Sequence, residues 1–195
     1  MCCAEWVATM QRELVVQARN GDLEAFTQLL KVSLRRLTGV ANLILRDSDL
    51  AEDAVQDACL SAWRGLRALR DPDAWDAWLH RLTVRACYKV GRKERRRSMV
   101  ELHVTSDPRP APDRDISTDV VDRDWLGREL GRLGLDQRTV MVLHYYLDLP
   151  VSEVAEILDI PYGTAASRLH RGLETLRASM REQLEHDHDL VTELP

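Results

Sequence analysis

Several features of membrane, secreted and metal-binding proteins are missing from this sequence of 195 residues. No apolar run approaches the ~18 residues that a membrane helix needs, so we expect no membrane insertion. The N-terminal stretch has no basic leader followed by an apolar core, so we expect no secretory signal. Cys2, Cys3, Cys59 and Cys87 show no C-x-x-C spacing, which gives no support to a zinc site or a disulfide framework. We expect reduced thiols in a cytoplasmic protein.

Strand patterns and catalytic signatures are missing as well. No stretch of any length alternates apolar and polar residues as a half-buried β-strand does, and no internal repeat is present. The sequence has neither a phosphate-binding loop nor a nucleophile–base arrangement, so we expect no enzyme and no cofactor. Two acidic groups are alternatives for a metal site, in the helix that contains Glu52, Asp53 and Asp57 and in the segment 185–189 (EHDHD). The second has no scaffold, and we expect no metal at either.

The charges are distributed in blocks along the chain. The net charge of −5 argues against a uniformly basic nucleic-acid binder. However, the segment from Arg85 to Arg97 contains seven Lys or Arg residues and a single acid, Glu94. The segment 101–124 contains seven acids and three arginines, and the segment from Glu182 to the end contains five acids and no Lys or Arg. The basic segment is therefore the candidate for contacts with phosphates.

Apolar residues recur at helical spacing through both halves, so we expect an all-α fold. The pattern predicts helices over residues 5–20, 23–45 and 49–65, a helix from Ala74 into the basic segment, and further helices over 125–133 and 140–147. Residues 99–123 contain Pro108, Pro110 and Pro112 and many acids, which is typical of a solvated linker. We therefore expect two small helical domains, 1–98 and 124–181, joined by the linker 99–123 and followed by an acidic tail, 182–195.

The helix over 49–65 is predicted to begin with a capping box, with Asp49 as the N-cap and Glu52 three residues later. Its helical pattern predicts that one face is buried and consists of Ala51, Ala54, Val55, Ala58 and Ala62. Another face carries Glu52, Asp53, Gln56 and Asp57. Acids in a first turn are also favoured by the helix dipole, so simple helix stabilisation is an alternative to a binding role.

Three arginines, Arg64, Arg67 and Arg70, lie in a predicted loop over 64–73, and Trp75 and Trp78 follow it. Cationic and aromatic groups in one place suit single-stranded nucleic acid, because bases stack on the rings and phosphates pair with the cations. Each tryptophan is alternatively a core residue. The basic segment that continues this helix is alternatively a solvated face.

The stretch from Leu149 to Arg171 predicts two short helices with a tight break. Pro150 suits the start of the first helix, and Asp159-Ile160-Pro161 ends it, because the residue before a proline is pushed out of helical geometry. The second helix starts near Tyr162. Its inner face consists of Ala165, Leu169, Gly172 and Leu176, and its other faces carry Thr164, Ser167, Arg168, His170 and Arg171. This pattern predicts a helix-turn-helix, with an ordinary helical hairpin as the alternative.

Taken together, these segments resemble the sigma-70 family, in its small two-domain extracytoplasmic-function members. The resemblance to region 2 is carried by GDLEAF (21–26), DLAEDAVQDACLSAW (49–63), AWDAWLHRL (74–82) and GRKERRR (91–97). Residues 133–177 resemble region 4. The resemblance covers about 20–98 and 125–178, and the order of the segments and the linker between them also fit.

The resemblance implies a role for each group of residues. In the family, the segment matching Glu52, Asp53, Gln56 and Asp57 docks on the clamp-helix coiled coil of RNA polymerase. The segment matching Arg64, Arg67, Arg70, Trp75 and Trp78 captures flipped bases of the minus-ten element, and Arg92, Arg95 and Arg96 match promoter-backbone contacts. Thr164, Ser167, Arg168, His170 and Arg171 lie on the helix that enters the major groove at the minus-thirty-five element.

The sequence also departs from the family pattern. Arg85 stands where the family usually has Asn, and Lys89 stands where it often has Asp. Ala166 and Leu173 replace residues that are usually cations in the family. Asp159 occupies a turn position that is usually Gly. Fewer cations in the second domain predict weaker attraction to phosphates there.

We therefore expect a bacterial alternative sigma factor. It would have no catalysis of its own, would bind core RNA polymerase, and would direct it to promoter DNA. By analogy with the family, we also expect an anti-sigma factor as a partner. The alternative is a stand-alone helix-turn-helix regulator that binds duplex DNA without polymerase. The first half of the chain argues against that alternative, because a repressor does not need the acidic helix or the arginine loop.

Overall fold

The computed structural model describes residues 3–102 and 121–192, and all regular elements in these ranges are helices. The all-α expectation is therefore confirmed. The chain divides into two compact units, Met1–Pro112 and Asp113–Pro195. Among the described residues, no helix is both long enough and apolar enough to cross a membrane. The predicted linker falls largely on residues 103–120, which lie outside the described ranges.

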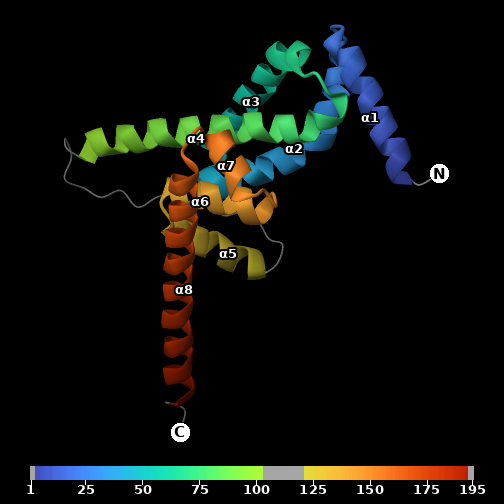
Figure 1. The fold of residues 1–195 in the computed structure, drawn as a ribbon. Helices are drawn as coiled ribbons and strands as arrows, with labels where there is room; N and C mark the ends of the chain where they lie inside the picture. Colours follow the sequence, from blue (N-terminus) through green and yellow to red (C-terminus); the bar gives the residue numbers. More distant parts are fainter. Residues whose placement is uncertain (1–2, 103–120, 193–195) are drawn as a thin grey trace. The chain divides into compact units, whose positions relative to one another are not determined.

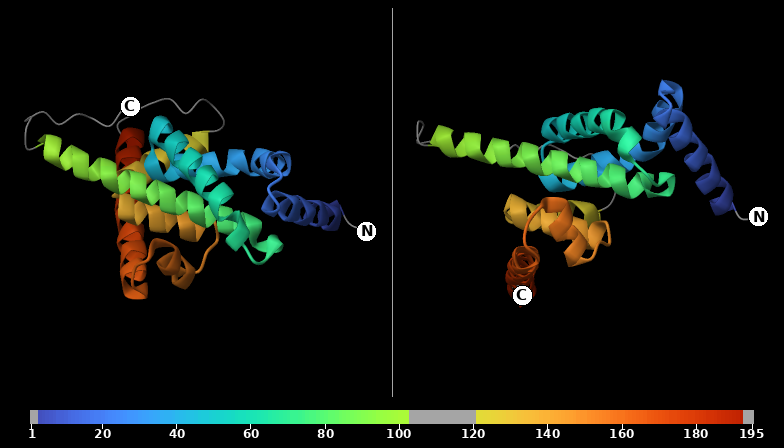
Figure 2. Two further views of the ribbon diagram at one scale, coloured as in Figure 1. Left: turned by 90° about the horizontal axis from the view of Figure 1, so that it is seen from above. Right: turned by 45° about the horizontal axis from the view of Figure 1, so that its top comes forward.

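Residues 3–102, the described part of the first unit, form four α-helices and two short 3₁₀ turns (Figure 1). They are α1 (Cys3–Arg19), α2 (Leu23–Leu45), α3 (Ser48–Gly65), η1 (Leu66–Ala68), η2 (Pro72–Ala74) and α4 (Trp75–Leu102). Helices α2, α3 and α4 pack against one another, and α1 packs on α2 and on η2. The C-terminal half of α4 carries the basic segment. It extends beyond α2 and α3 in Figure 1 and Figure 2.

The buried side of α3 is built mainly from alanine. All five predicted positions, Ala51, Ala54, Val55, Ala58 and Ala62, are buried. Small side chains let the backbones of neighbouring helices approach closely, which explains how α3 fits against both α2 and α4. Larger side chains such as Leu37, Ile44 and Trp75 fill the remaining core.

Side-chain caps begin two of these helices. Asp22 caps α2, accepting hydrogen bonds from the backbone N–H groups of Glu24 and Ala25. The predicted N-cap of α3 was wrong. Asp47 is the cap, with its side chain accepting from the N–H groups of Asp49 and Leu50, and α3 begins at Ser48. Both aspartates suit an N-cap, but only Asp47 has the extended backbone (φ −140°, ψ 118°) that a cap requires.

The second unit contains α5 (Val121–Arg132), α6 (Leu135–Met141), the π-helical turn η3 (Val142–Tyr146), α7 (Val151–Leu158) and α8 (Tyr162–Thr192). Helix α8 packs on α5, α6 and α7 and then continues past them (Figure 1). Where we expected a separate acidic tail from residue 182, the backbone stays helical to Thr192. The side chains after Glu182 lie outside the description.

The turn between α7 and α8 forms where the proline predicted it. Asp159 adopts a left-handed conformation (φ 53°, ψ 51°) and ends α7. Its N–H bonds to carbonyl groups of the last turn of α7, and the N–H of Ile160 bonds to the carbonyl of Ala155. These bonds satisfy carbonyl groups that a helix end leaves unpaired. The expected helix-turn-helix is therefore present as α7, this turn and α8.

Candidate functional surfaces

The four polar residues of α3 form one exposed face. Glu52, Asp53, Gln56 and Asp57 are all exposed, on the side of α3 away from its buried alanines. Leu60, three residues after Asp57, is 53% exposed and continues this face. Sequence reasoning missed Leu60, because an apolar residue in a helical pattern is normally assigned to the core. The acidic face therefore ends in an apolar group.

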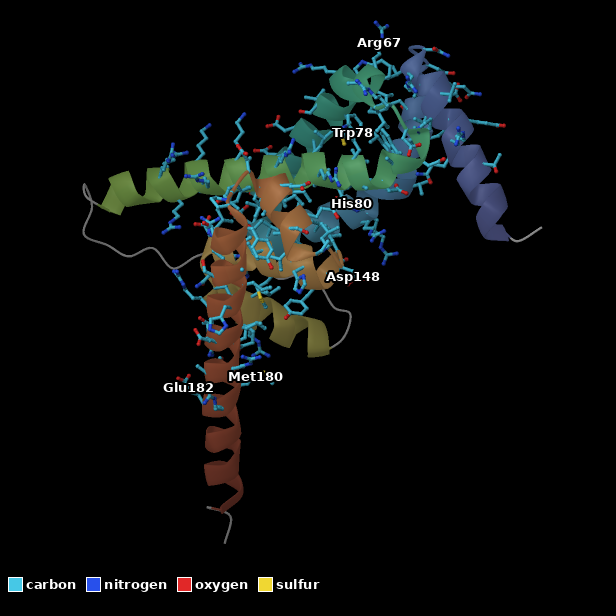
Figure 3. All side chains as sticks on the ribbon, in the orientation of Figure 1. Arg67, Trp78, His80, Asp148, Met180 and Glu182 are labelled. Carbon is cyan, nitrogen blue, oxygen red and sulfur yellow. The ribbon has the colours of Figure 1, made fainter. Side chains whose placement is uncertain are left out.

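Exposed and buried side chains repeat every three residues along the arginine loop. Arg64, Arg67 and Arg70 are exposed, whereas Leu66, Leu69 and Pro72 are buried. In a 3₁₀ turn, side chains three positions apart lie above one another, so the η1 turn helps place the leucines inward and the arginines outward. Figure 3 shows the side chain of Arg67 extending away from the helices. Arg64 lies in the last turn of α3, and Arg67 and Arg70 lie in the segment after it. The segment is anchored by apolar residues, and the three cations are presented to solvent.

Two tryptophans after the loop have different surroundings. Trp75 is fully buried, and its ring packs edge-on against Phe26 at 6.0 Å between centroids. The expected contact between Trp75 and DNA bases is therefore wrong in this conformation, and the core alternative holds. Trp78 is partly exposed and lies over Gly65, where a Cβ atom would be 3.4 Å from its ring. Trp78 therefore lies directly beside the arginine loop.

Helix α1 reaches the same loop through two polar contacts. Nη1 of Arg12 lies 2.6 Å from Oδ2 of Asp73, and Nε2 of Gln11 donates to Oδ2 of Asp76 at 2.9 Å. These pairs join residues more than 60 positions apart, so no local pattern indicates them. Asp73 is the last residue of the arginine loop and Asp76 follows it, so α1 braces the end of that loop.

The basic segment on α4 is exposed. Arg92, Arg95 and Arg96 are all in contact with solvent, and the guanidinium of Arg92 lies 5.5 Å from the centroid of the Tyr88 ring. Helical spacing distributes these cations around the projecting half of α4. The surface is suited to a polyanion.

The predicted DNA-reading residues of α8 do not have equal access to solvent. His170 and Arg171 are exposed, whereas Thr164, Ser167 and Arg168 are partly buried. Nε2 of His170 lies 3.2 Å from Oε1 of Glu174, and the Ser167 hydroxyl donates to the carbonyl of Thr164. The structure thus brings the polar residues onto one helix, with His170 and Arg171 most open to a ligand.

Tyr162 is a candidate contact that sequence reasoning left out. It opens α8 and is 62% exposed. In a helix-turn-helix, the first turn of the second helix points toward the bases. The sequence shows an aromatic residue at that position, but it does not show that the residue is exposed.

The described ranges contain no cluster of candidate metal ligands. No group of three or more His, Cys, Asp or Glu residues there is arranged to hold a metal ion. The alternative metal segment 185–189 lies among the side chains outside the description. Cys59 and Cys87 are free thiols, and burial raises the pKa of Cys87 to about 12, which keeps it protonated and unreactive.

Comparison with known protein families gives two matches, in the order of the two units. Residues 29–97 match the model described as Sigma-70 region 2, and residues 123–176 match Sigma-70, region 4. The acidic face, the arginine loop and the basic segment lie within the first range. The exposed residues of α8 lie within the second.

Curated relatives align over most of the chain. It is 34% identical over 159 residues to the ECF RNA polymerase sigma factor SigM of Mycobacterium tuberculosis, covering 82% of this chain and 79% of that protein. It is 26% identical over 183 residues to the ECF RNA polymerase sigma factor SigW of Bacillus subtilis, covering 89% and 98%.

Two solved structures have a similar fold. The structure of CnrH in complex with the cytosolic domain of CnrY matches with a TM-score of 0.59 and 25% identity, covering 89% of this chain and 98% of that one. The sigma factor RpoE of Bartonella quintana, solved in complex with the anti-sigma factor NepR, matches with a TM-score of 0.62 and 24% identity, covering 82% and 98%.

Proposed function

This chain belongs to the extracytoplasmic-function sigma factors of the sigma-70 family, and from that membership we propose how its own residues perform the family's task. It is an alternative sigma factor: it binds core RNA polymerase and directs transcription initiation at specific promoters. The family consists of transcription initiation factors, and we propose that this chain likewise catalyses no reaction itself. We propose that it acts in the cytoplasm, where polymerase and promoter DNA are found.

The acidic face of α3 is the proposed contact with core polymerase. The supporting observation is that Glu52, Asp53, Gln56 and Asp57 are all exposed on the side of α3 away from its buried alanines. Helix stabilisation alone does not account for Asp57, which lies beyond the first turn where the helix dipole acts. A basic partner surface would pair with these carboxylates, and Leu60 would add apolar contact area at the end of the face.

The exposed cations are the proposed contacts with promoter DNA. Arg64, Arg67 and Arg70, with Trp78 beside them, suit unpaired bases and phosphates of the minus-ten element. Arg92, Arg95 and Arg96 suit the promoter backbone, because phosphate contacts fix the position of a protein on DNA. On α8, we propose that Thr164, Ser167, His170 and Arg171 face the minus-thirty-five element. Trp75 is left out, because it is buried.

Run-off transcription with purified core polymerase tests this function. The wild-type chain should give transcripts from defined start sites on a library of promoter fragments, and core polymerase alone should not. Reversing charge on the acidic face, with Asp53→Lys and Asp57→Lys, should weaken binding to core polymerase by about tenfold or more, because like charges then meet across the interface. Pull-down and fluorescence titration measure that binding.

Glu13→Lys is the matched control, since Glu13 is also an exposed acid, but lies on α1. It should bind core polymerase like the wild type. The proposal fails if the wild-type chain never supports transcription. The stand-alone regulator is the correct alternative if the chain binds promoter DNA equally well without polymerase.

We also propose that an anti-sigma factor controls this chain. The support is that both similar structures were solved as complexes, CnrH with the cytosolic domain of CnrY and RpoE with the anti-sigma factor NepR. A protein that covers the acidic face of α3 would prevent docking on polymerase. The test is to purify the chain at its natural level and add any co-purifying protein to the run-off assay. A specific partner should abolish transcription, and isolation of the chain without any stoichiometric partner under all growth conditions would contradict this control.

A further inference from the structure

Arg168 is held against α6 by an ion pair. Its Nη2 atom lies 3.2 Å from Oδ2 of Asp136, in the first turn of α6. The two side chains are only 21% and 31% exposed, so each is largely enclosed by the unit. A pair that is shielded in this way attracts more strongly than a surface pair, because less water screens the charges. The pair therefore links α6 to the second helix of the helix-turn-helix.

The same side of α8 makes further contacts with α5 and α6. Gly172 is buried four residues after Arg168, and a Cβ atom there would lie 3.1 Å from Cγ of Met141 in α6. Ser179 is buried seven residues further on and accepts a hydrogen bond from Nη1 of Arg132 in α5. Residues spaced by four and seven positions share a helix face. Arg168 thus belongs to the packing side of α8, unlike the exposed His170 and Arg171.

We propose that Arg168 is a positioning residue, and that its ion pair with Asp136 fixes the orientation in which α8 presents Ser167, His170 and Arg171 to DNA. This inference rests on the proposed function of the second unit in reading the minus-thirty-five element. Arg168 itself does not read a base, although arginine is the residue that most often contacts guanine. The sequence alone groups Arg168 with the reading residues, because only the fold reveals its partner 32 positions away.

The position of the pair explains why it would matter. At Gly172 the backbone of α8 approaches Met141 with no side chain of its own to interlock. That contact sets the distance between α6 and α8. It does not by itself prevent α8 from sliding along α6 or rotating about its own axis, so side chains elsewhere must limit these movements. Arg168 lies one turn nearer to the DNA-reading end and supplies a directional link to α6. Reading residues must be held within about half an ångström of their working geometry, so a loosened helix loses binding at every base it reads.

Transcription from a promoter pool randomised across the minus-thirty-five region tests the inference. The full chain is used with core polymerase, and the transcribed templates are sequenced to give both the yield and the base preference. Arg168→Gln and Asp136→Asn should each lower the yield by roughly three- to tenfold, and the double variant should be no worse than either single variant, because the two residues act as one pair. The base preference should stay that of the wild type. Arg171→Gln is the comparison, and it should change the preference at one position.

The charge-swapped double variant, Asp136→Arg with Arg168→Asp, should recover yield relative to the single variants. Circular dichroism establishes whether each variant is folded. If a single variant unfolds, the swapped pair decides: a folded swapped pair with restored yield supports the inference, and a folded swapped pair without transcription overturns it.

Two further outcomes are distinct. If Arg168→Gln changes the base preference while Asp136→Asn leaves the yield unchanged, Arg168 reads a base and the inference is wrong. If the wild-type chain itself gives no promoter-specific transcript, the proposed function fails. Non-additive effects of the two substitutions on thermal unfolding then still report whether Asp136 and Arg168 are coupled.

Discussion

Two single residues have surroundings or a backbone conformation that should affect stability: a partly buried histidine and an aspartate with a positive φ. His80 on α4 is one of them (Figure 3). Its Nε2 atom is buried and has no hydrogen-bond partner among the described residues. Burial lowers the pKa of the His80 imidazole below its ordinary value of 6.5, and the positive charge of Arg36 on α2 lowers it further, against an opposite effect of Asp76. His80 is therefore neutral in the folded chain at neutral pH.

We predict that His80 makes the first unit less stable in mild acid. The unfolded chain takes up a proton at this residue as the pH falls below about 6.5, whereas the folded chain resists it. The free energy of unfolding should therefore fall between about pH 7.5 and about pH 5.5, and less so in His80→Phe, which cannot titrate. Urea unfolding at both pH values measures the difference. An equal fall in wild type and variant would show that other groups are responsible.

Asp159 is a strained residue at the turn of the helix-turn-helix. Its positive φ of 53° suits glycine, which has no Cβ atom to clash. We predict that Asp159→Gly raises the free energy of unfolding of the second unit by about 0.5–1 kcal/mol. Thermal unfolding measures the change. The matched control is Glu156→Gly, in the interior of α7, which should lower stability by about 1 kcal/mol. Loss of stability in both variants would mean that the Asp159 side chain contributes more than its strain costs.

At the scale of elements, the start of α3 matters because this helix carries the acidic face. Its N-cap, Asp47, holds the first turn, in which the acid is Asp49. Glu52 and Asp53 follow in the second turn. The helix dipole favours carboxylates near the start of a helix, and this effect falls off within the first turn, so it favours Asp49 more than Glu52 or Asp53. Asp57 and Leu60 lie further along α3, where the helix dipole does not account for them, so they are the sharper test of docking.

We predict that Asp47→Ala lowers the free energy of unfolding of the first unit by about 1 kcal/mol, because two N–H groups of α3 lose their acceptor. Asp49→Ala is the matched control, and it should change stability by less than about half as much, because Asp49 is not the cap. Chemical denaturation compares the two variants. If Asp49→Ala lowered stability more than Asp47→Ala, Asp49 would be the N-cap, as the sequence pattern predicted.

At the scale of the whole molecule, charge is separated along the chain. A net charge of −5 coexists with a cationic half of α4, an acidic face on α3 and a C-terminal segment rich in acids. Different surfaces can therefore meet a basic protein partner and a polyanion without competing for the same residues. Local charge, rather than the sum, decides what each surface binds.

We predict that the basic segment gives promoter binding part of its dependence on salt. Replacing Arg95 and Arg96 by Gln should reduce the slope of log K against log salt concentration, for the chain bound to core polymerase, by roughly 1 to 2, because each neutralised phosphate contact releases about one counterion. The matched control replaces Lys31 and Arg35, two exposed cations of α2, and should leave the slope almost unchanged. Equal slopes in all three proteins would exclude the basic segment from the DNA interface.

Local patterns along the chain were enough to predict the helical fold, the bounds of α2 and α7, the buried alanine face of α3 and the family. These depend on local signals: the spacing of apolar residues, a proline after Asp159, and short motifs in a fixed order. Such signals act between residues a few positions apart, so they can be read along the chain.

Packing in the folded chain selects which of several chemically suitable residues takes each role. Asp47 rather than Asp49 caps α3, because only one of them has the right backbone conformation. Trp75 is in the core while Trp78 lies over Gly65 beside the arginine loop, and Arg168 turns to Asp136 while Arg171 faces solvent. Each of these outcomes depends on which side of a helix meets its neighbour, and on partners far away in the sequence. Packing fixes both.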